Sequence, residues 1–144
     1  MRISFHYQVP SFRIKNKKRL TDWILLVAFL EKKEVEKIDF IFCNDEYLLQ
    51  LNKQFLSHKN YTDVLTFNYS EKKKSITAEI YGSIDRVREN ARLFNVSFEE
   101  ELHRVIIHGI LHCIGYHDKN DRDRRRMRNK EDECLGLLEE MKKS

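Results

Sequence analysis

The 144-residue sequence predicts a single α+β domain with a mixed four-stranded sheet packed by about five helices. The length matches one domain, since domains usually hold about 100–200 residues. The apolar share of 41% is enough for one hydrophobic core. Strand patterns dominate the first part of the chain and helical patterns the second, and no repeat or linker interrupts it. We therefore expect residues 1–144 to form one domain.

The first half of the chain predicts two strands and two helices in alternation. Residues 3–7 alternate between apolar and polar side chains, which is the period of a half-buried strand. Residues 15–33 carry apolar residues at helical spacing and predict an amphipathic helix. Residues 35–43 alternate again and form the second strand. Asn44 is a good N-cap for a helix that extends to about residue 56.

The second half begins with the remaining strands and continues with helices. Residues 64–69 follow a polar loop and are rich in residues that favour strands, and residues 75–83 supply the fourth strand. Residues 84–94 have a helical pattern. Ser97 and Glu100 have the spacing of a capping box, which predicts that the next helix starts there.

Composition excludes several classes of protein. Charged residues of both signs make up 35% of the chain, which also holds nine Phe, six Tyr and one Trp, unlike a disordered chain of one charge sign. Four Gly and one Pro exclude collagen-like and linker sequences. The longest apolar run, residues 23–30, is far shorter than the ~18–20 residues that span a bilayer.

Cysteine content and charge indicate the compartment. Cys43, Cys113 and Cys134 are odd in number and lack CxxC spacing, so we expect a reducing compartment rather than a disulfide framework. The first residues do not have the pattern of a signal peptide, and we expect a cytoplasmic protein. The net charge of +4 is compatible with a nucleic-acid partner but indicates one only weakly.

The segment from His108 to Asp118 carries the strongest chemical signal. On a helix, positions i and i+4 share a face, so His108 and His112 present two imidazoles to one point, as in a transition-metal site. Gly115 ends the helix and lets the backbone turn sharply, so that the following residues can fold back. Asp118 or His117 could supply a third ligand and leave the fourth position to water, as catalytic zinc requires.

Histidines and cysteines on this helix also have interpretations without a metal. An HxxxH pair on an apolar helix often serves packing or capping. Cys113 points away from the face of the two histidines, so we expect a core residue, with a soft ligand as the lesser alternative. His103 lies off the same line and is expected in the core or in solvent. Gly109 stands where HExxH peptidases carry a Glu general base, which makes a zinc peptidase a minor alternative.

Residues 108–118, HGILHCIGYHD, resemble the signature of the YbeY endoribonuclease family, H-G-x-L-H-x-x-G-Y followed by an acidic residue and a His. Other segments resemble the family in the same order along the chain. They are LNKQF at 51–55, YTDVLTF at 61–67, EIY at 79–81 and DRVRENA at 85–91. The matches cover roughly residues 40–140, and such an order of motifs over a whole domain is hard to obtain by chance.

The resemblance implies a single-domain metal-dependent hydrolase with one Zn²⁺ per chain on a zincin-like metal helix. It implies that His108 and His112 are catalytic residues and metal ligands, that Asp118 is the third ligand, and that His117 is the alternative. The implied activity is cleavage of single-stranded RNA in ribosomal RNA maturation and ribosome quality control. The implied partners are single-stranded RNA and the ribosome or its RNA, with no DNA and no membrane partner expected.

The order of the last two signature residues departs from the family. The family usually has Asp followed by His, whereas this chain has His117 followed by Asp118. We favour Asp118 as the ligand because a carboxylate is an acceptable zinc ligand and another register would require a different turn after Gly115. Tyr61 replaces a Pro of the family and is expected to change loop stiffness rather than chemistry.

Leu56 is the departure that bears on catalysis. The family often has an Arg at this position, held to assist catalysis, so a cationic group that would stabilise phosphate charge is missing. The nearby cations in the sequence that could replace it are Lys53, His58 and Lys59.

The last predicted helix, residues 121–141, opens with a basic run. Contact with an RNA backbone is the functional interpretation, but a solvated helix face balanced by acidic neighbours is favoured. The cations are Arg122, Arg124, Arg125, Arg126, Arg128 and Lys130, and the acids are Asp121, Asp123, Glu131, Asp132 and Glu133. Tyr116, just before this helix, either stacks on a base or packs the turn.

Two alternatives to a ribonuclease stay open. The first is a non-catalytic, zinc-stabilised module that binds RNA or the ribosome. Its metal would be structural, with four protein ligands that include both His117 and Asp118. The second is another zinc hydrolase acting on an amide or ester, which needs a general base that the sequence does not show near the metal helix.

Overall fold

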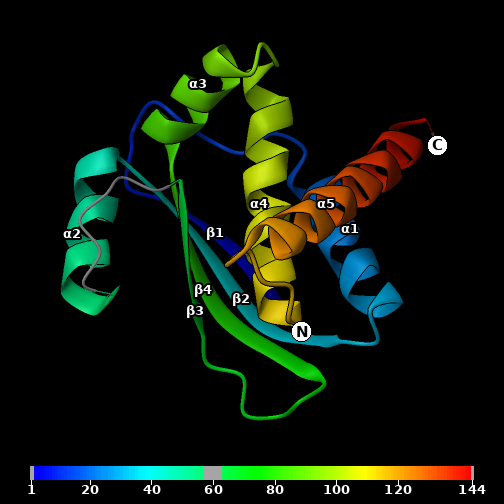
Figure 1. Ribbon diagram of the computed structural model, residues 1–144. Helices are drawn as coiled ribbons and strands as arrows, with labels where there is room; N and C mark the ends of the chain where they lie inside the picture. Colours follow the sequence, from blue (N-terminus) through cyan, green and yellow to red (C-terminus); the bar gives the residue numbers. More distant parts are fainter. Residues whose placement is uncertain (1, 57–62, 144) are drawn as a thin grey trace.

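The computed structural model describes residues 2–56 and 63–143, and four strands and five helices lie in these ranges (Figure 1). The elements in chain order are β1 (Arg2–Tyr7), α1 (Lys17–Leu30), β2 (Glu34–Cys43), α2 (Asp45–Leu56), β3 (Val64–Asn68), β4 (Ser75–Ser83), α3 (Ile84–Leu93), α4 (Phe98–Ile114) and α5 (Asp121–Lys142). The predicted α+β class, with a four-stranded sheet and five helices, is confirmed.

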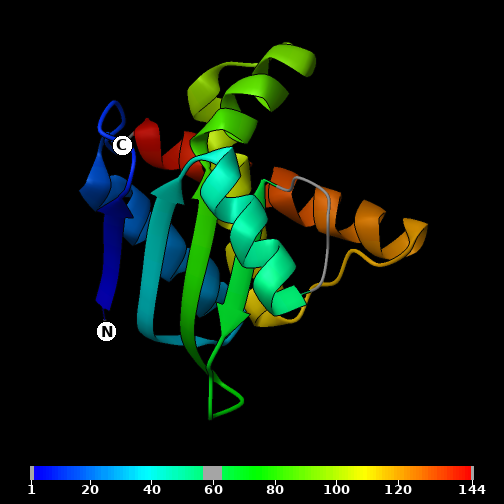
Figure 2. The same cartoon turned by 90° about the vertical axis from the view of Figure 1, so that its left-hand side faces the viewer.

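The sheet has the strand order β1-β2-β4-β3 and is mixed. β1, β2 and β4 are parallel neighbours, and β3 pairs antiparallel with β4 at one edge. Figure 2 shows α2 in front of the sheet, and Figure 1 shows α1, α4 and α5 on the other side. α4 contacts β3 and β4, and α5 packs on α4 and α1. The metal helix predicted from sequence is therefore a central helix between the sheet and α5.

Side-chain caps explain why several helix boundaries were predictable. Ser97 Oγ accepts a hydrogen bond from the Glu100 backbone N–H at 3.0 Å, and Asn44 Oδ1 accepts one from Tyr47 N–H at 2.8 Å. α1 is shorter than the predicted 15–33. Asn16 has left-handed backbone angles just before it, and Lys32 has a φ of 60° just after it, so the helix cannot extend through either residue.

The hydrophobic core lies between the sheet and the helices α1, α4 and α5. Trp23 of α1 is fully buried, and its indole N–H donates a hydrogen bond to the Cys134 carbonyl of α5 at 2.7 Å. From α4, residues Ile106, Ile107 and Ile110 are fully or almost fully buried. Each side chain of this size contributes about 1.5–3 kcal/mol when it leaves water, so this packing holds α4 firmly on the sheet.

Gly109 allows the closest approach of α4 to the sheet. A Cβ atom at this position would lie 2.8 Å from Cγ2 of Ile80 in β4 and 3.5 Å from Oγ1 of Thr66 in β3. Position 109 therefore faces the sheet, and no side chain fits there without displacing Ile80. Among the described helices, none has both the length and the apolar character of a membrane-spanning segment.

Replacing Gly109 by Ala should destabilise the protein. We expect the free energy of unfolding to fall by about 1–3 kcal/mol, because the added methyl overpacks the contact with the stiff, buried Ile80 side chain. Gly136→Ala in α5 is the matched control, since a Cβ there meets no atom within 4 Å. That substitution should add roughly 0.5–1 kcal/mol through helix propensity. Urea unfolding of the two variants measures both effects, and a Gly109→Ala variant as stable as Gly136→Ala would contradict the close contact.

Candidate metal centre

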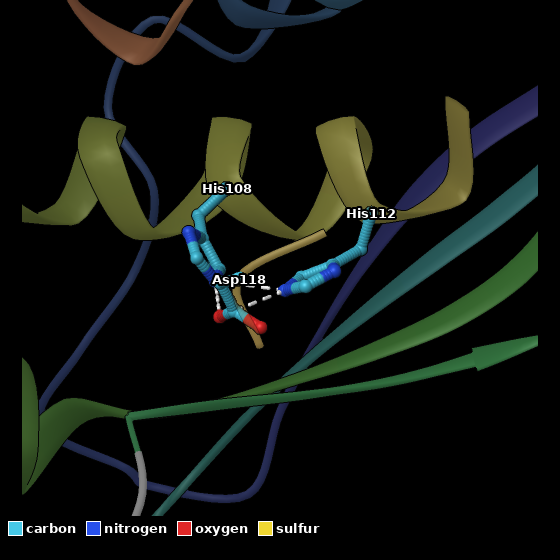
Figure 3. A group of neighbouring side chains, drawn as sticks. All are labelled: His108, His112 and Asp118. Carbon is cyan, nitrogen blue, oxygen red and sulfur yellow. Dashed lines mark hydrogen bonds and ion pairs between the residues drawn. The ribbon is translucent and has the colours of Figure 1, made fainter. Parts of the chain in front are cut away.

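His108 and His112 project from one side of α4 toward a common point (Figure 3). Their Nε2 atoms lie 3.0 Å apart, and their ring planes are inclined at 82°. The side chains are 22% and 27% exposed, so both rings are mostly buried but reach solvent. The i, i+4 spacing thus produces the convergent pair of nitrogen atoms that the sequence predicts.

Asp118 joins this pair through the turn at the end of α4. Gly115 adopts a φ of +123°, a backbone conformation that other residues rarely take, and ends the helix. The chain then folds back, and Asp118 Oδ2 lies 3.4 Å from His108 Nε2 and 3.3 Å from His112 Nε2. We call His108, His112 and Asp118 the donor group, because their atoms could donate electron pairs to a metal ion. His117 is exposed and does not belong to the donor group in the described chain.

The spacing of the three donor atoms fits a small metal ion. Zinc bonds of about 2.0–2.1 Å in a tetrahedron require neighbouring donors roughly 3.3 Å apart. The observed separations of 3.0–3.4 Å form one face of such a tetrahedron. Two imidazoles and one carboxylate suit Zn²⁺, and the same set with open positions also suits Fe²⁺. Within the described residues, His108, His112 and Asp118 are close enough to hold a metal ion.

Glu131 orients the first histidine from the neighbouring helix α5. Its Oε2 lies 2.6 Å from His108 Nδ1, and its Oε1 accepts a hydrogen bond from Arg104 at 2.8 Å. Burial disfavours protonation of His108, but the hydrogen bond and charge of Glu131, together with the charges of Asp63 and Asp118, outweigh it and raise the pKa of His108. With Nδ1 engaged, Nε2 is the nitrogen that points to the metal position, as in carboxylate–histidine–metal sites.

The sequence interpretation of Glu131 as part of a solvated helix face is wrong. Only 5% of the residue is exposed, because it lies on the inner stripe of α5. The buried residues of this helix are Met127, Glu131, Cys134 and Leu138. These positions recur at intervals of three or four residues, so a carboxylate on an otherwise apolar stripe was the signal that could have revealed its role.

A cleft of about 320 Å³ borders His108 and Asp118. Asp63 and Glu101 line it beside Glu131, and burial is the main cause that raises the pKa of both carboxyl groups. The charge of Asp63 further raises the pKa of Glu101, to about 7. The sequence showed no general base near the helix, whereas the folded chain brings these carboxyl groups into the same cleft from the residue just before β3 and from α4.

Three other residues that the sequence singled out, Tyr116, Cys113 and His103, are packed against neighbouring side chains. Tyr116 packs the turn: its hydroxyl donates to Glu31 at 3.0 Å, and the Arg126 guanidinium lies 5.2 Å from the centre of its ring. Cys113 is half-buried against the core, and burial raises its thiol pKa to about 12. His103 is buried with its ring edge-on to Trp23. His103 and Cys113 therefore belong to the core.

Of the cations that could replace an Arg at position 56, the structure describes Lys53 only. Lys53 is an exposed residue of α2, and Leu56 is the last residue of that helix. His58 and Lys59 lie outside the described residues, as does Tyr61.

A central helix with two convergent histidines and a returning carboxylate, packed on a mixed sheet, defines a class of small α+β proteins with a candidate single-metal site. A family model described as "Endoribonuclease YbeY" matches residues 4–139, a longer region than the 40–140 indicated by the motifs. The chain belongs to the YbeY endoribonuclease family.

Individual relatives agree with this assignment. Proteins named "Endoribonuclease YbeY" from Flavobacterium psychrophilum and Flavobacterium johnsoniae are 50% and 45% identical over 136 residues, which cover 94% of this chain and 96% of each relative. The solution structure of TM1509 from Thermotoga maritima is 32% identical and superposes with a TM-score of 0.65. That match covers 95% of this chain and 89% of the other.

Substituting Glu131 by Gln should weaken metal binding. The neutral amide cannot stabilise charge on His108 as the carboxylate does, so we expect a loss of about 10–100-fold in Zn²⁺ affinity. Asp132→Asn is the matched control, because Asp132 is also paired with Arg104, at 2.7 Å, but does not contact His108. Competition with a chelator measures the Zn²⁺ affinities of the variants. Equal losses of affinity in the two variants would show that pairing with Arg104, and not the contact with His108, determines metal affinity.

Glu101 should make the metal-free protein less stable as the pH rises. Its pKa is about 7 in the folded chain, above the ordinary 4.5, so the folded state holds the proton more tightly. The stabilisation from this proton is complete below about pH 4.5 and disappears as the pH rises through 7. Relative to Glu101→Gln, the wild-type unfolding free energy should therefore fall by roughly 2–3 kcal/mol between pH 5 and 8.

Glu100→Gln, one position earlier and exposed, is the control for the Glu101 experiment. Chemical unfolding at several pH values measures the differences. If the gap between wild type and Glu101→Gln stays constant with pH, Glu101 has an ordinary pKa in the folded chain.

Proposed function

We propose that this protein is a zinc-dependent endoribonuclease that cleaves single-stranded RNA as one domain spanning residues 1–144. The proposal extends to ribosomal RNA maturation and ribosome quality control in the cytoplasm. Two findings support it: membership of a family whose relatives are named endoribonucleases, and the three convergent donor atoms on and after α4. The donor group carries the argument, because it joins residues 108, 112 and 118 at the distances that a metal ion requires.

In this proposal, His108, His112 and Asp118 hold one Zn²⁺ through Nε2, Nε2 and Oδ2. When bound, zinc lowers the pKa of a coordinated water to near 7 and polarises a phosphoryl oxygen. Glu131 keeps His108 in the tautomer that presents Nε2. Glu101, with a pKa of about 7 at the edge of the same cleft, is suited to exchange a proton with substrate groups near neutral pH.

A closed structural zinc site is the competing arrangement. It would need a fourth protein ligand, for which the sequence offered His117. Within the described residues, the donor group contains three members, and a cleft borders two of them. This arrangement favours an open coordination position and hence an enzyme over a non-catalytic RNA- or ribosome-binding module.

Cleavage of single-stranded RNA by the purified chain, with and without a chelator, tests the proposal. We expect His112→Ala and Asp118→Ala to lose bound metal and to lower the RNA cleavage rate by more than about 100-fold. This loss exceeds the usual effect of removing a residue that only hydrogen-bonds to a metal ligand. His117→Ala is the matched control, since His117 is adjacent to Asp118 but exposed and outside the donor group. This variant should keep its metal and its rate.

The same experiment separates the alternatives. A folded, metal-loaded chain that binds RNA without cleaving it would favour the binding module. Loss of metal in His117→Ala would favour His117 as a ligand. Duplex DNA and a peptide substrate complete the panel, and cleavage of the peptide but not of RNA would favour the other class of zinc hydrolase.

A further inference from the structure

The cleft that borders His108 and Asp118 also contains three arginines. Arg104 comes from α4, and Arg124 and Arg128 come from the first turns of α5. The fold thus brings guanidinium groups to the donor group from a part of the chain that lies far in sequence from Leu56, where the family often has its Arg.

The three arginines differ in how far their charge is already compensated. Arg104 is 17% exposed and forms ion pairs with Glu131 and Asp132 at 2.8 and 2.7 Å. Arg124 is paired with Asp121 and lies 3.4 Å from the backbone oxygen of Asp118. Arg128 forms no ion pair with the acidic groups of the described chain and is exposed. Its guanidinium is the cleft charge that remains available to a ligand.

None of the acidic groups that line the cleft forms an ion pair with Arg128 within the described chain. Glu131 is engaged by both Arg104 and His108. Asp63 and Glu101 are carboxyl groups whose pKa values burial raises, and the nearby charge of Arg128 acts on Glu101 in the opposite direction. Arg128 and Glu101 line the same cleft, so the Arg128 side chain borders this cavity as well as bulk solvent.

We propose that Arg128, assisted by Arg124, binds a phosphate of the RNA backbone at the mouth of the cleft beside His108 and Asp118. This inference rests on the proposed function and deepens it, because it assigns the substrate-binding cations. A guanidinium binds phosphate through two parallel N–H donors, which gives orientation as well as charge. The residues lie at i and i+4 on α5 and so border the cleft from the same side of the helix.

The assignment separates the basic run of α5 into residues with different roles. Arg126 covers the ring of Tyr116, and Lys130 pairs with Glu31 and Glu133 at 3.2 and 3.1 Å, so both hold the turn and α1. Arg125 is exposed and does not border the cleft. It has the same charge and lies on the same helix, and it is therefore the matched control for Arg128.

The test is binding of a fluorescent single-stranded RNA oligonucleotide to the full-length, zinc-loaded chain, measured by anisotropy over a range of salt concentrations. A 2′-O-methyl backbone slows cleavage during the measurement. Arg128→Ala should raise Kd by about tenfold at low salt and lower the salt slope by roughly 0.7, the value for one phosphate contact on a single strand. Arg125→Ala should change Kd by less than about twofold, since a solvated cation away from the cleft contributes only general attraction.

The inference would be overturned if Arg128→Ala and Arg125→Ala changed Kd equally, or if Arg128→Ala left Kd unchanged. A wild-type chain that does not bind the oligonucleotide would also overturn it. A thermal unfolding curve that matches wild type shows that Arg128→Ala is folded. The nuclease proposal fails separately, if the wild-type chain does not cleave unmodified RNA. In that case the comparison of Arg128 and Arg125 still decides whether the cleft binds the RNA backbone.

Discussion

The contact between α4 and β4 at Gly109 determines how the rest of the site is arranged. Because position 109 faces Ile80 of the sheet and leaves no room for a Cβ atom, the close contact places this side of α4 against β4. His108 and His112 then lie on the adjoining side of the helix, half-buried and next to the cleft. The Gly that separates this sequence from the HExxH peptidases is thus explained by packing, since a larger residue would collide with the sheet.

Helix α5 completes the site from the side opposite the sheet. Its buried Glu131 joins His108 of the metal helix to Arg104 one turn away, so the orientation of the imidazole depends on how the two helices pack. The ion pair between Glu131 and Arg104 is largely shielded from water, since these side chains are only 6% and 17% exposed. In such surroundings, a charged group is stable only with its partners in place, and removing one partner leaves the others unpaired. Stability and the arrangement of the candidate metal ligands therefore depend on the same contacts.

The charge around the cleft shows that the two sides of one helix have different surroundings. Toward α1 and the turn after α4, cations of α5 have partners within the chain: Lys130 pairs with Glu31, and Arg126 lies over the ring of Tyr116. Toward the cleft, Arg128 has no acidic partner within the described chain. An alternation of Arg with Asp and Glu in the sequence cannot distinguish these cases, because which charges meet depends on neighbouring helices rather than on neighbouring residues.

Local rules were enough to determine the elements, the histidine pair and the turn that follows it. Strand alternation, the caps at Asn44 and Ser97, and the positive φ required of Gly115 are properties of a few adjacent residues, so the sequence alone contains them. The strand order, the burial of Glu131 and the gathering of carboxyl and guanidinium groups at the cleft were decided only by the tertiary structure. These features join residues tens of positions apart, and only the packing of whole elements around one core brings them into contact.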